Sequence, residues 1–197
     1  MENADDIPDF ILERFRVGRL PKTVEMVRTL QTVPGTEGGM RRVTGLNTDA
    51  QGRVNDFSET NQRGTRIRNE KVHHVRRALT APEIFGPDTN DVLIVGWGSS
   101  RGAIEEAIYS CTKHGIKASG LHLKIVYPLP MMLKEIFAKY KKVVTVEVAY
   151  GDALKPSPLA MMLRAATLVD VWPMLADATG RPLRPKSIVE KVKEVLK

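Results

Sequence analysis

The chain has 197 residues, of which 42% are hydrophobic and 27% charged, and it carries a formal net charge of +7. Its one cysteine, Cys111, excludes a disulfide framework and any cysteine-ligated cluster or zinc site built from this chain alone. No apolar run approaches the ~20 residues of a membrane span, and no charged-then-apolar leader opens the chain. Together with the lone thiol, these features predict a cytoplasmic protein.

Residues 1–87 are expected to form an extension of helices and loops. Apolar spacing predicts helices at about 7–16 and 23–31, and the many Gly, Thr, Asn and Asp residues of 34–56 predict a loop. A charged helix is predicted from about Ser58 to Leu79, followed by a linker at 80–90. The basic residues between Arg63 and Arg77 could attract nucleic acid. No aromatic residue interleaves with them, so we favour a solvated helix face or a subunit contact.

Residues 88–197 are expected to form an α/β domain, because predicted strands and helices alternate. Strands are predicted at 92–95, 117–123, 142–148 and 168–171, and helices at about 101–114, 132–140 and 156–166. A last helix is predicted to begin with a capping box formed by Ser187 and Glu190. Alternation of this kind predicts an open, mostly parallel sheet with helices on both faces.

The segment from Asp91 to Ala107 is the most informative part of this domain. It is expected to form a buried strand, a tight turn at Gly96 and Gly98, and the start of a helix. Ser99 or Ser100 could cap that helix, whose free N–H groups can bind an anion. The candidate anion-binding residues are therefore Gly98, Ser99, Ser100 and Arg101. The alternative, which we favour, is a tight βα turn without a ligand.

A dinucleotide-binding site is not favoured at this turn. Arg101 stands where close packing of helix on strand requires Gly or Ala, and no acidic residue ends the second strand to hold a ribose. His73 and His74 are adjacent on the charged helix and have no second pair of ligands nearby, so no metal site is expected. No catalytic constellation is visible either.

Glu147 lies near the carboxyl end of the third predicted strand, where open α/β sheets collect ligands. We take Glu147, Tyr150 and Asp152 as candidate contacts with a ligand or a partner subunit. Pairing of Glu147 with a basic residue across an interface is the interpretation that we favour.

Several segments, in this order, resemble one enzyme family. They are Pro34–Arg53, Asp91–Ile104, Leu121–Pro130 with its Tyr-Pro-Leu-Pro stretch, Val144–Val148 and, more weakly, Asp177–Pro185. Together they resemble the C-terminal part of the alpha subunit of 2-oxoacid:ferredoxin oxidoreductases, in particular the 2-oxoglutarate branch. The resemblance covers roughly residues 34–190.

The resemblance implies a transketolase C-terminal-like domain at 88–197, preceded by a connecting segment. Such enzymes decarboxylate a 2-oxoacid on thiamine diphosphate, pass electrons through iron–sulfur clusters to ferredoxin, and form an acyl-CoA. In that plan this domain supports subunit assembly, while thiamine diphosphate, magnesium and the clusters lie on other domains or chains. Ferredoxin would be an indirect partner, and the protein is expected to be an oligomer.

Two departures from the family pattern bear on function. Residues 47–50 replace a run that the family usually carries as Glu-His-Asp-Glu, and Gly151-Asp152-Ala153 does not match the Gly-Asp-Gly that begins a thiamine diphosphate signature. No asparagine follows Asn90 to complete such a signature. The leading hypothesis is a non-catalytic subunit or domain that works with thiamine-binding partner chains. The alternative is a stand-alone α/β module that binds an anion or a nucleotide such as coenzyme A.

Overall fold

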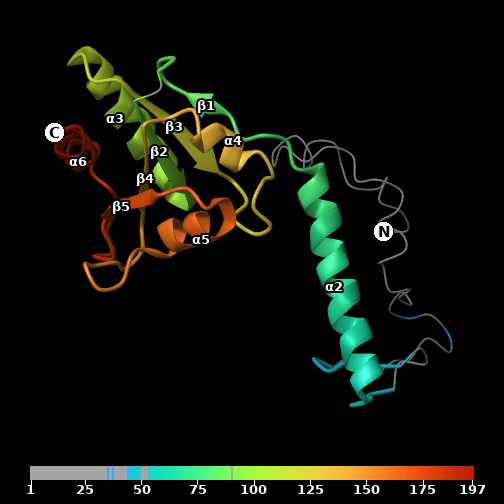
Figure 1. Ribbon diagram of the computed structural model, residues 1–197. Helices are drawn as coiled ribbons and strands as arrows, with labels where there is room; N and C mark the ends of the chain where they lie inside the picture. Colours follow the sequence, from blue (N-terminus) through green and yellow to red (C-terminus); the bar gives the residue numbers. More distant parts are fainter. Residues whose placement is uncertain (1–34, 36, 38–43, 50–52, 90) are drawn as a thin grey trace. The chain divides into compact units, whose positions relative to one another are not determined.

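The structure is a computed structural model that describes residues 35, 37, 44–49, 53–89 and 91–197. The chain divides into two compact units, residues 1–79 and residues 80–197 (Figure 1). The predicted helices at 7–16 and 23–31 lie outside the described residues. None of the described helices is long and apolar enough to cross a bilayer.

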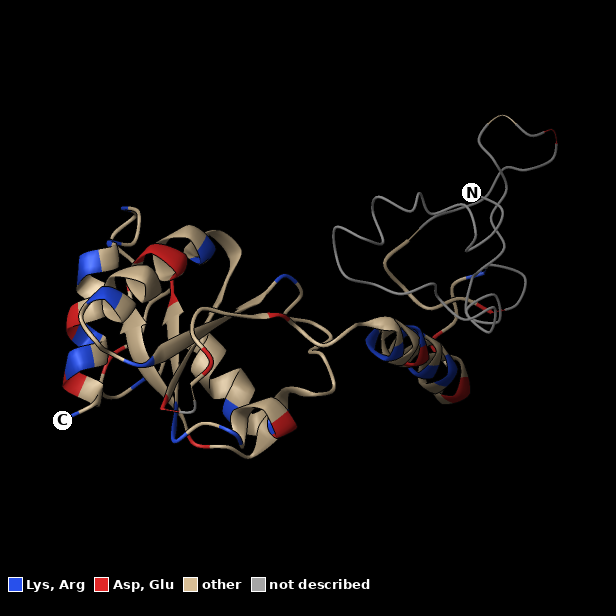
Figure 2. Ribbon diagram, turned by 90° about the horizontal axis from the view of Figure 1, so that it is seen from above, with Lys and Arg blue, Asp and Glu red and all other residues tan. Residues whose placement is uncertain are grey.

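The first unit contains one long described helix, α2, from Ser58 to Ala78. Its basic character is visible in Figure 2, and none of its residues is buried. An isolated antiparallel bridge between Thr48 and Val54 precedes it. The side chain of Asn47 links the two: it donates a 2.7 Å hydrogen bond to Asn61 and accepts a 2.6 Å bond from Arg68. The predicted charged helix at 58–79 is thus confirmed to within one residue.

The second unit contains a five-stranded sheet with the order β1-β3-β2-β4-β5. The strands are β1 (Ile84–Phe85), β2 (Val92–Trp97), β3 (Ala118–Leu123), β4 (Lys142–Glu147) and β5 (Val171–Ala176). All neighbouring pairs are parallel except β1 and β3. The predicted open, mostly parallel α/β sheet is confirmed. The predicted linker at 80–90 is wrong in part, because Ile84 and Phe85 pair with β3 as an edge strand.

Helices cover both faces of this sheet, as predicted (Figure 1). They are α3 (Arg101–Lys113), α4 (Leu133–Phe137), α5 (Pro158–Thr167) and α6 (Pro185–Val195). Side chains alternate along a strand, so Val92 and Ile94 of β2 pack with α3 and α6, whereas Leu93 and Val95 pack with α4 and α5. The two resulting cores sandwich the strands and hold their carboxyl ends at one edge.

Local backbone chemistry explains several helix boundaries. Helix α3 ends at Lys113, with His114 as its C-cap. Gly115 follows with a φ of +71°, which lets the N–H of Ile116 donate a 2.9 Å hydrogen bond to the carbonyl of Cys111. The predicted capping box at Ser187 is wrong. Pro185 is the first residue of α6, so the N-cap is Arg184, three residues before Ser187, and it makes no side-chain cap bond.

The end of α5 differs most from the prediction. Leu168, expected to begin a strand, instead ends the helix in the left-handed conformation, with a φ of 58° and its N–H bonded to the carbonyl of Arg164. Strand β5 therefore starts only at Val171. The left-handed conformation is unfavourable for leucine, because its Cβ crowds the following carbonyl oxygen.

Replacing Leu168 with glycine is expected to stabilise the fold. Glycine adopts left-handed φ without steric cost, and the leucine side chain is largely exposed, so little packing is lost. We expect Leu168→Gly to raise the free energy of unfolding by about 1 kcal/mol. Urea unfolding of dilute protein measures the change. Equal or lower stability would contradict the backbone argument.

Candidate functional site

The carboxyl ends of the parallel strands lie at one edge of the sheet. Along the chain, β2, β3, β4 and β5 are the first to fourth parallel strands, and their spatial order is second, first, third, fourth. The connection after β2 leads to α3 on one face, whereas the connection after β4 leads to α5 on the other. The chain thus changes direction between β2 and β4, the place where doubly wound sheets bind ligands.

The turn after β2 is tightly constructed. Gly96 lies opposite Val146 in the sheet, and a Cβ there would stand 2.3 Å from Ile104 Cδ1 and 2.5 Å from Ser100 Oγ. Gly98 has a φ of +60° and starts a 3-10 turn, Gly98–Ser100, that leads directly into α3. Both glycines are therefore required by geometry, as the sequence predicts: one by the packing of helix on strand, the other by backbone conformation.

The serines of this turn do not cap α3. Ser100 is buried at the N-cap position, but its hydroxyl donates a 2.8 Å hydrogen bond to the carbonyl of Trp97. That bond tightens the turn and leaves the first N–H groups of α3 without a side-chain cap. The predicted serine cap is therefore wrong at Ser100. Ser99 is exposed in the same turn.

Arg101, the charged member of the candidate anion site, is already engaged. Its Nε donates a 2.7 Å hydrogen bond to Glu105, one turn further along α3. Its guanidinium also lies 5.7 Å from the centre of the Phe85 ring on β1. Because β1 and β3 lie on the other side of β2 from β4, these contacts draw Arg101 away from the place where the chain changes direction.

His122 joins β3 to the same turn. Its Nε2 lies 3.0 Å from the carbonyl of Gly98, so Nε2 carries the proton, and its buried Nδ1 has no hydrogen-bond partner among the described residues. Burial lowers the pKa of His122 below its ordinary value, and the nearby Arg101 and Lys124 add to this, while the Gly98 bond and Glu105 oppose it. The neutral imidazole therefore fits this site.

Acid is expected to loosen the turn through His122. The unfolded state binds a proton near the ordinary pKa and the folded state only at lower pH, so stability is present above about pH 6.5 and falls as the pH drops below it. His122→Gln retains an N–H donor for Gly98 but cannot titrate. We expect the variant to lose less stability than wild type between about pH 7.5 and pH 5 in urea unfolding. Parallel pH profiles would contradict this role.

Glu147 ends β4 and is fully buried. Both carboxylate oxygens accept the N–H of Leu159, at 3.1 and 3.2 Å, in the first turn of α5. The positive end of a helix dipole favours a negative charge at this position. Glu147 thus stabilises the start of α5 within its own unit. Ser157, the N-cap residue, is also buried, and its hydroxyl has no partner among the described residues.

Tyr150 and Asp152 lie together in the loop between β4 and α5. The Tyr150 hydroxyl donates a 2.6 Å bond to Asp152, which also accepts the backbone N–H groups of Leu154 and Lys155 at 2.8 Å each. These bonds lower the pKa of Asp152 and raise that of Tyr150. Both residues are exposed, unlike Glu147.

The residues around Asp152 do not fit a diphosphate-bound magnesium ion. Its carboxylate is occupied by the hydroxyl and two N–H groups, and Gly151 lies against Ser157, with a Cβ position only 3.0 Å from the Ser157 nitrogen. Across the described part of the chain, no group of three His, Cys, Asp or Glu side chains could hold a metal ion.

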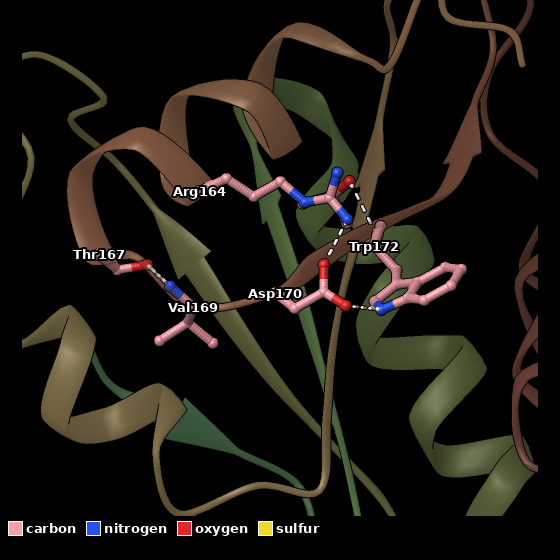
Figure 3. A network of polar contacts seen from close by, with 6 residues as sticks. Arg164, Thr167, Val169, Asp170 and Trp172 are labelled. Carbon is pink, nitrogen blue, oxygen red and sulfur yellow. Dashed lines mark hydrogen bonds and ion pairs between the residues drawn. The ribbon is translucent and has the colours of Figure 1, made fainter. Parts of the chain in front are cut away.

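One network of polar contacts was not predicted from the sequence. Asp170 accepts a hydrogen bond from the guanidinium of Arg164 on α5 and a 2.8 Å bond from the indole nitrogen of Trp172 on β5 (Figure 3). Nearby, the Thr167 hydroxyl accepts the N–H of Val169. The side chains of Arg164, Asp170 and Trp172 belong to no sequence motif. They meet only because α5 packs beside β5.

Comparison with known proteins agrees with this fold. The family model of pyruvate:ferredoxin oxidoreductase core domain II matches residues 90–188. The chain is 32% identical over 162 residues to 2-oxoglutarate oxidoreductase subunit KorA of Mycobacterium tuberculosis, covering 77% of this chain and 24% of that protein. It is 30% identical over 117 residues to 2-oxoacid:ferredoxin oxidoreductase 1 subunit alpha of Aeropyrum pernix, covering 57% of this chain and 17% of that one.

A solved structure extends the similarity. The 2-oxoglutarate:ferredoxin oxidoreductase from Magnetococcus marinus, with 2-oxoglutarate, coenzyme A and succinyl-CoA bound, superposes with a TM-score of 0.73 at 28% identity. The match covers 88% of this chain and 30% of that one. The chain spans about a quarter of the length of the Mycobacterium relative, so it corresponds to one part of such a subunit. It belongs to the family of pyruvate:ferredoxin oxidoreductase core domain II and is homologous to part of the alpha subunits of 2-oxoacid:ferredoxin oxidoreductases.

Proposed function

We propose that this chain is a non-catalytic subunit or domain of a 2-oxoacid:ferredoxin oxidoreductase. The observation that supports this proposal is that the chain belongs to the family but spans only 24% of the length of the KorA relative. It would serve assembly with partner chains that bind thiamine diphosphate, magnesium and iron–sulfur clusters. Those chains would perform the oxidative decarboxylation of a 2-oxoacid to an acyl-CoA and the reduction of ferredoxin.

The chemistry of the described residues supports a structural role. The carboxylates nearest to the carboxyl edge are used inside the unit: Glu147 holds the start of α5, and Asp152 holds its own loop. Within this proposal, residues 88–197 belong to the transketolase C-terminal-like domain, which also includes β1 (Ile84–Phe85) as its edge strand, and the residues before β1 form the connecting extension. The exposed Tyr150 and Asp152 are the residues that would meet a partner directly, and Glu147 would act by holding the segment that follows β4.

Co-expression with the chains encoded beside its gene tests the proposal. We expect co-elution as one complex, and we expect that complex to reduce ferredoxin with a 2-oxoacid and coenzyme A. Omission of this chain should cause the complex to dissociate or lose activity. A chain that elutes alone and leaves the activity of its neighbours unchanged would contradict the proposal.

The second hypothesis is a coenzyme A-binding or nucleotide-binding module at Gly98–Arg101. It predicts calorimetric binding by the isolated chain that weakens in Arg101→Ala. The contacts of Arg101 with Glu105 and Phe85 compete with such a ligand, so we favour the subunit role. Binding heat with coenzyme A and no association with neighbouring chains would reverse this preference.

A further inference from the structure

The two edges of the sheet in the second unit differ sharply in charge. At the amino edge, the parallel strands begin and α3, α4 and α6 end. Lys142 marks this edge, because its ammonium donates a hydrogen bond to the carbonyl of Val195 at the end of α6. Exposed lysines gather there: Lys113, Lys117, Lys139, Lys141, Lys142, Lys193 and Lys197. Lysine is depleted in protein interfaces, so this edge is suited to remain in solvent.

The carboxyl edge, by contrast, carries few charges and much exposed apolar surface. The chain leaves β2, β3 and β4 through residues 97–100, 124–132 and 148–157, which contain few charged residues. Seven large apolar side chains of these segments have the following exposed fractions: Leu154 96%, Tyr127 72%, Tyr150 60%, Met131 54%, Met132 49%, Val148 44% and Trp97 38%. We call these seven side chains the carboxyl-edge surface.

The sheet brings the three segments to one place. Trp97 lies opposite Leu123, the last residue of β3, and its neighbour Gly96 lies opposite Val146 of β4. The order of these strands is β3-β2-β4, and neighbouring strands lie about 4.8 Å apart. The segments after β3 and β4 therefore leave the sheet about 10 Å apart, on either side of Trp97.

Contacts within each segment keep the apolar side chains at this edge. Residues 128–130 are buried, which fixes the loop that exposes Tyr127 before them and Met131 after them. In the third segment, Asp152 accepts both the Tyr150 hydroxyl and the N–H of Leu154. A surface whose backbone is already held in place loses little conformational entropy when a partner binds.

The polar groups at this edge bond within the unit instead of converging on a ligand. Glu147 accepts the N–H of Leu159, and the hydroxyl of Ser100 donates to the carbonyl of Trp97. Arg101 pairs with Glu105. Small-molecule sites combine an apolar lining with a few convergent polar groups, whereas protein interfaces are enriched in exposed Trp, Tyr and Met. The composition therefore favours a protein as the occupant.

The size of the surface agrees with a protein partner. With about 150–250 Å² for a large side chain, the seven exposed fractions amount to on the order of 800 Å². Single-chain proteins leave apolar patches of about 300–600 Å² uncovered. One partner of a standard interface contributes about 800 Å².

The charges favour a partner of different sequence. A net charge of +7 on each chain opposes pairing with a second copy. Arg181 and Arg184 are exposed in the loop after β5, and this loop starts beside β4, because the N–H of Asp177 bonds to the carbonyl of Glu147. Guanidinium groups bind carboxylates strongly. The partner that fits has an apolar patch with acidic side chains at its border.

We infer that the carboxyl-edge surface is the docking surface for such a partner protein, while the lysine-rich amino edge faces solvent. The inference rests on the proposed function, because that function supplies the partner chains. It adds the surface through which they bind. Tyr150 and Asp152 would lie at one side of a larger interface with Trp97 near its centre.

Titration of the full chain onto the immobilised chains encoded beside its gene tests the surface. Tyr127→Asp and Leu154→Asp should each raise the dissociation constant at least tenfold, because each places a carboxylate in an apolar contact. Tyr109→Asp is the matched control: this tyrosine on α3 is 63% exposed but lies away from the carboxyl edge, and its change should be less than about twofold. Circular dichroism confirms that each variant is folded.

Hydrogen exchange of the free and bound chain locates the contact independently of substitutions. We expect slower exchange on binding in residues 97–100, 124–132 and 148–157, and unchanged exchange in 113–117 and 139–142. Protection confined to the amino edge, or a complex insensitive to both Tyr127→Asp and Leu154→Asp, overturns this surface and leaves the subunit role intact. Protection of the carboxyl edge by coenzyme A alone, without binding of the neighbouring chains, overturns both.

Discussion

Gly96→Val is expected to lower the free energy of unfolding by about 3 kcal/mol, the largest loss among single changes at the turn between β2 and α3. The first added carbon would stand 2.3 Å from Ile104 Cδ1, 2.5 Å from Ser100 Oγ and 3.2 Å from the carbonyl oxygen of Val146. Ile104 is fully buried, and Ser100 is held by its bond to Trp97, so neither can yield freely. The neighbouring strand β4 would have to move as well.

The matched control is Gly102→Ala, six residues further along the chain in the first turn of α3. Nothing lies within 4 Å of a Cβ at Gly102, and alanine favours a helix, so this variant should be equal to or more stable than wild type by up to about 1 kcal/mol. Urea unfolding followed by circular dichroism measures both variants. If Gly96→Val unfolds at the wild-type midpoint, the close approach of α3 to β2 and β4 is wrong.

Glu147→Ala is expected to cost about 3 kcal/mol as well. The change leaves the N–H of Leu159 without its acceptor in a buried place, which costs about 1–3 kcal/mol, and it leaves a cavity where the side chain stood. It also removes a negative charge from the positive end of α5. Because Leu159, Ala160 and Leu163 fix α5 in the core, hydrogen exchange should increase throughout that helix.

Glu147→Gln is the control for shape and hydrogen bonding. The carboxamide oxygen can still accept the Leu159 N–H, so this variant should lose only about 1 kcal/mol, the value of the charge at the helix start. The pair of variants separates the two interpretations of Glu147. If the carboxylate pairs with a basic residue of a partner chain, Glu147→Gln will keep its stability but lose assembly. A Glu147→Ala variant of wild-type stability would contradict the role in holding α5.

The fold class was within reach of the sequence because it depends on local signals repeated along the chain. Short apolar runs such as Val92–Val95 alternate with amphipathic segments, and this pattern has few topological solutions. The roles of Gly96 and Gly98 could also be predicted from the sequence, since a strand that leads directly into a helix requires small residues at the turn. The family resemblance depended on the same segments, and it was confirmed by comparison.

Boundaries set by competition between neighbouring residues were less predictable. The Ser187 capping box follows a sound local rule, but Pro185 begins the helix earlier and removes the need for that cap. The sequence around Leu168 carries no signal for a left-handed helix end. The conformation there is set by tertiary packing, because Leu163 before it and Val171 after it enter the same core. Ile84 and Phe85 became an edge strand only because β3 offered an unpaired side.

The sequence by itself determined the alternating α/β layer, the tight turn at Gly96 and Gly98, and the resemblance to 2-oxoacid:ferredoxin oxidoreductase alpha subunits. Which polar groups meet was decided by tertiary structure. Nothing in the sequence indicates that Glu147 faces the start of α5, that Arg101 turns toward Phe85, or that Arg164 and Trp172 share Asp170. Local patterns record how each segment buries its apolar side, whereas polar partners depend on the distances between segments, which exist only once the sheet and its two helical layers have packed.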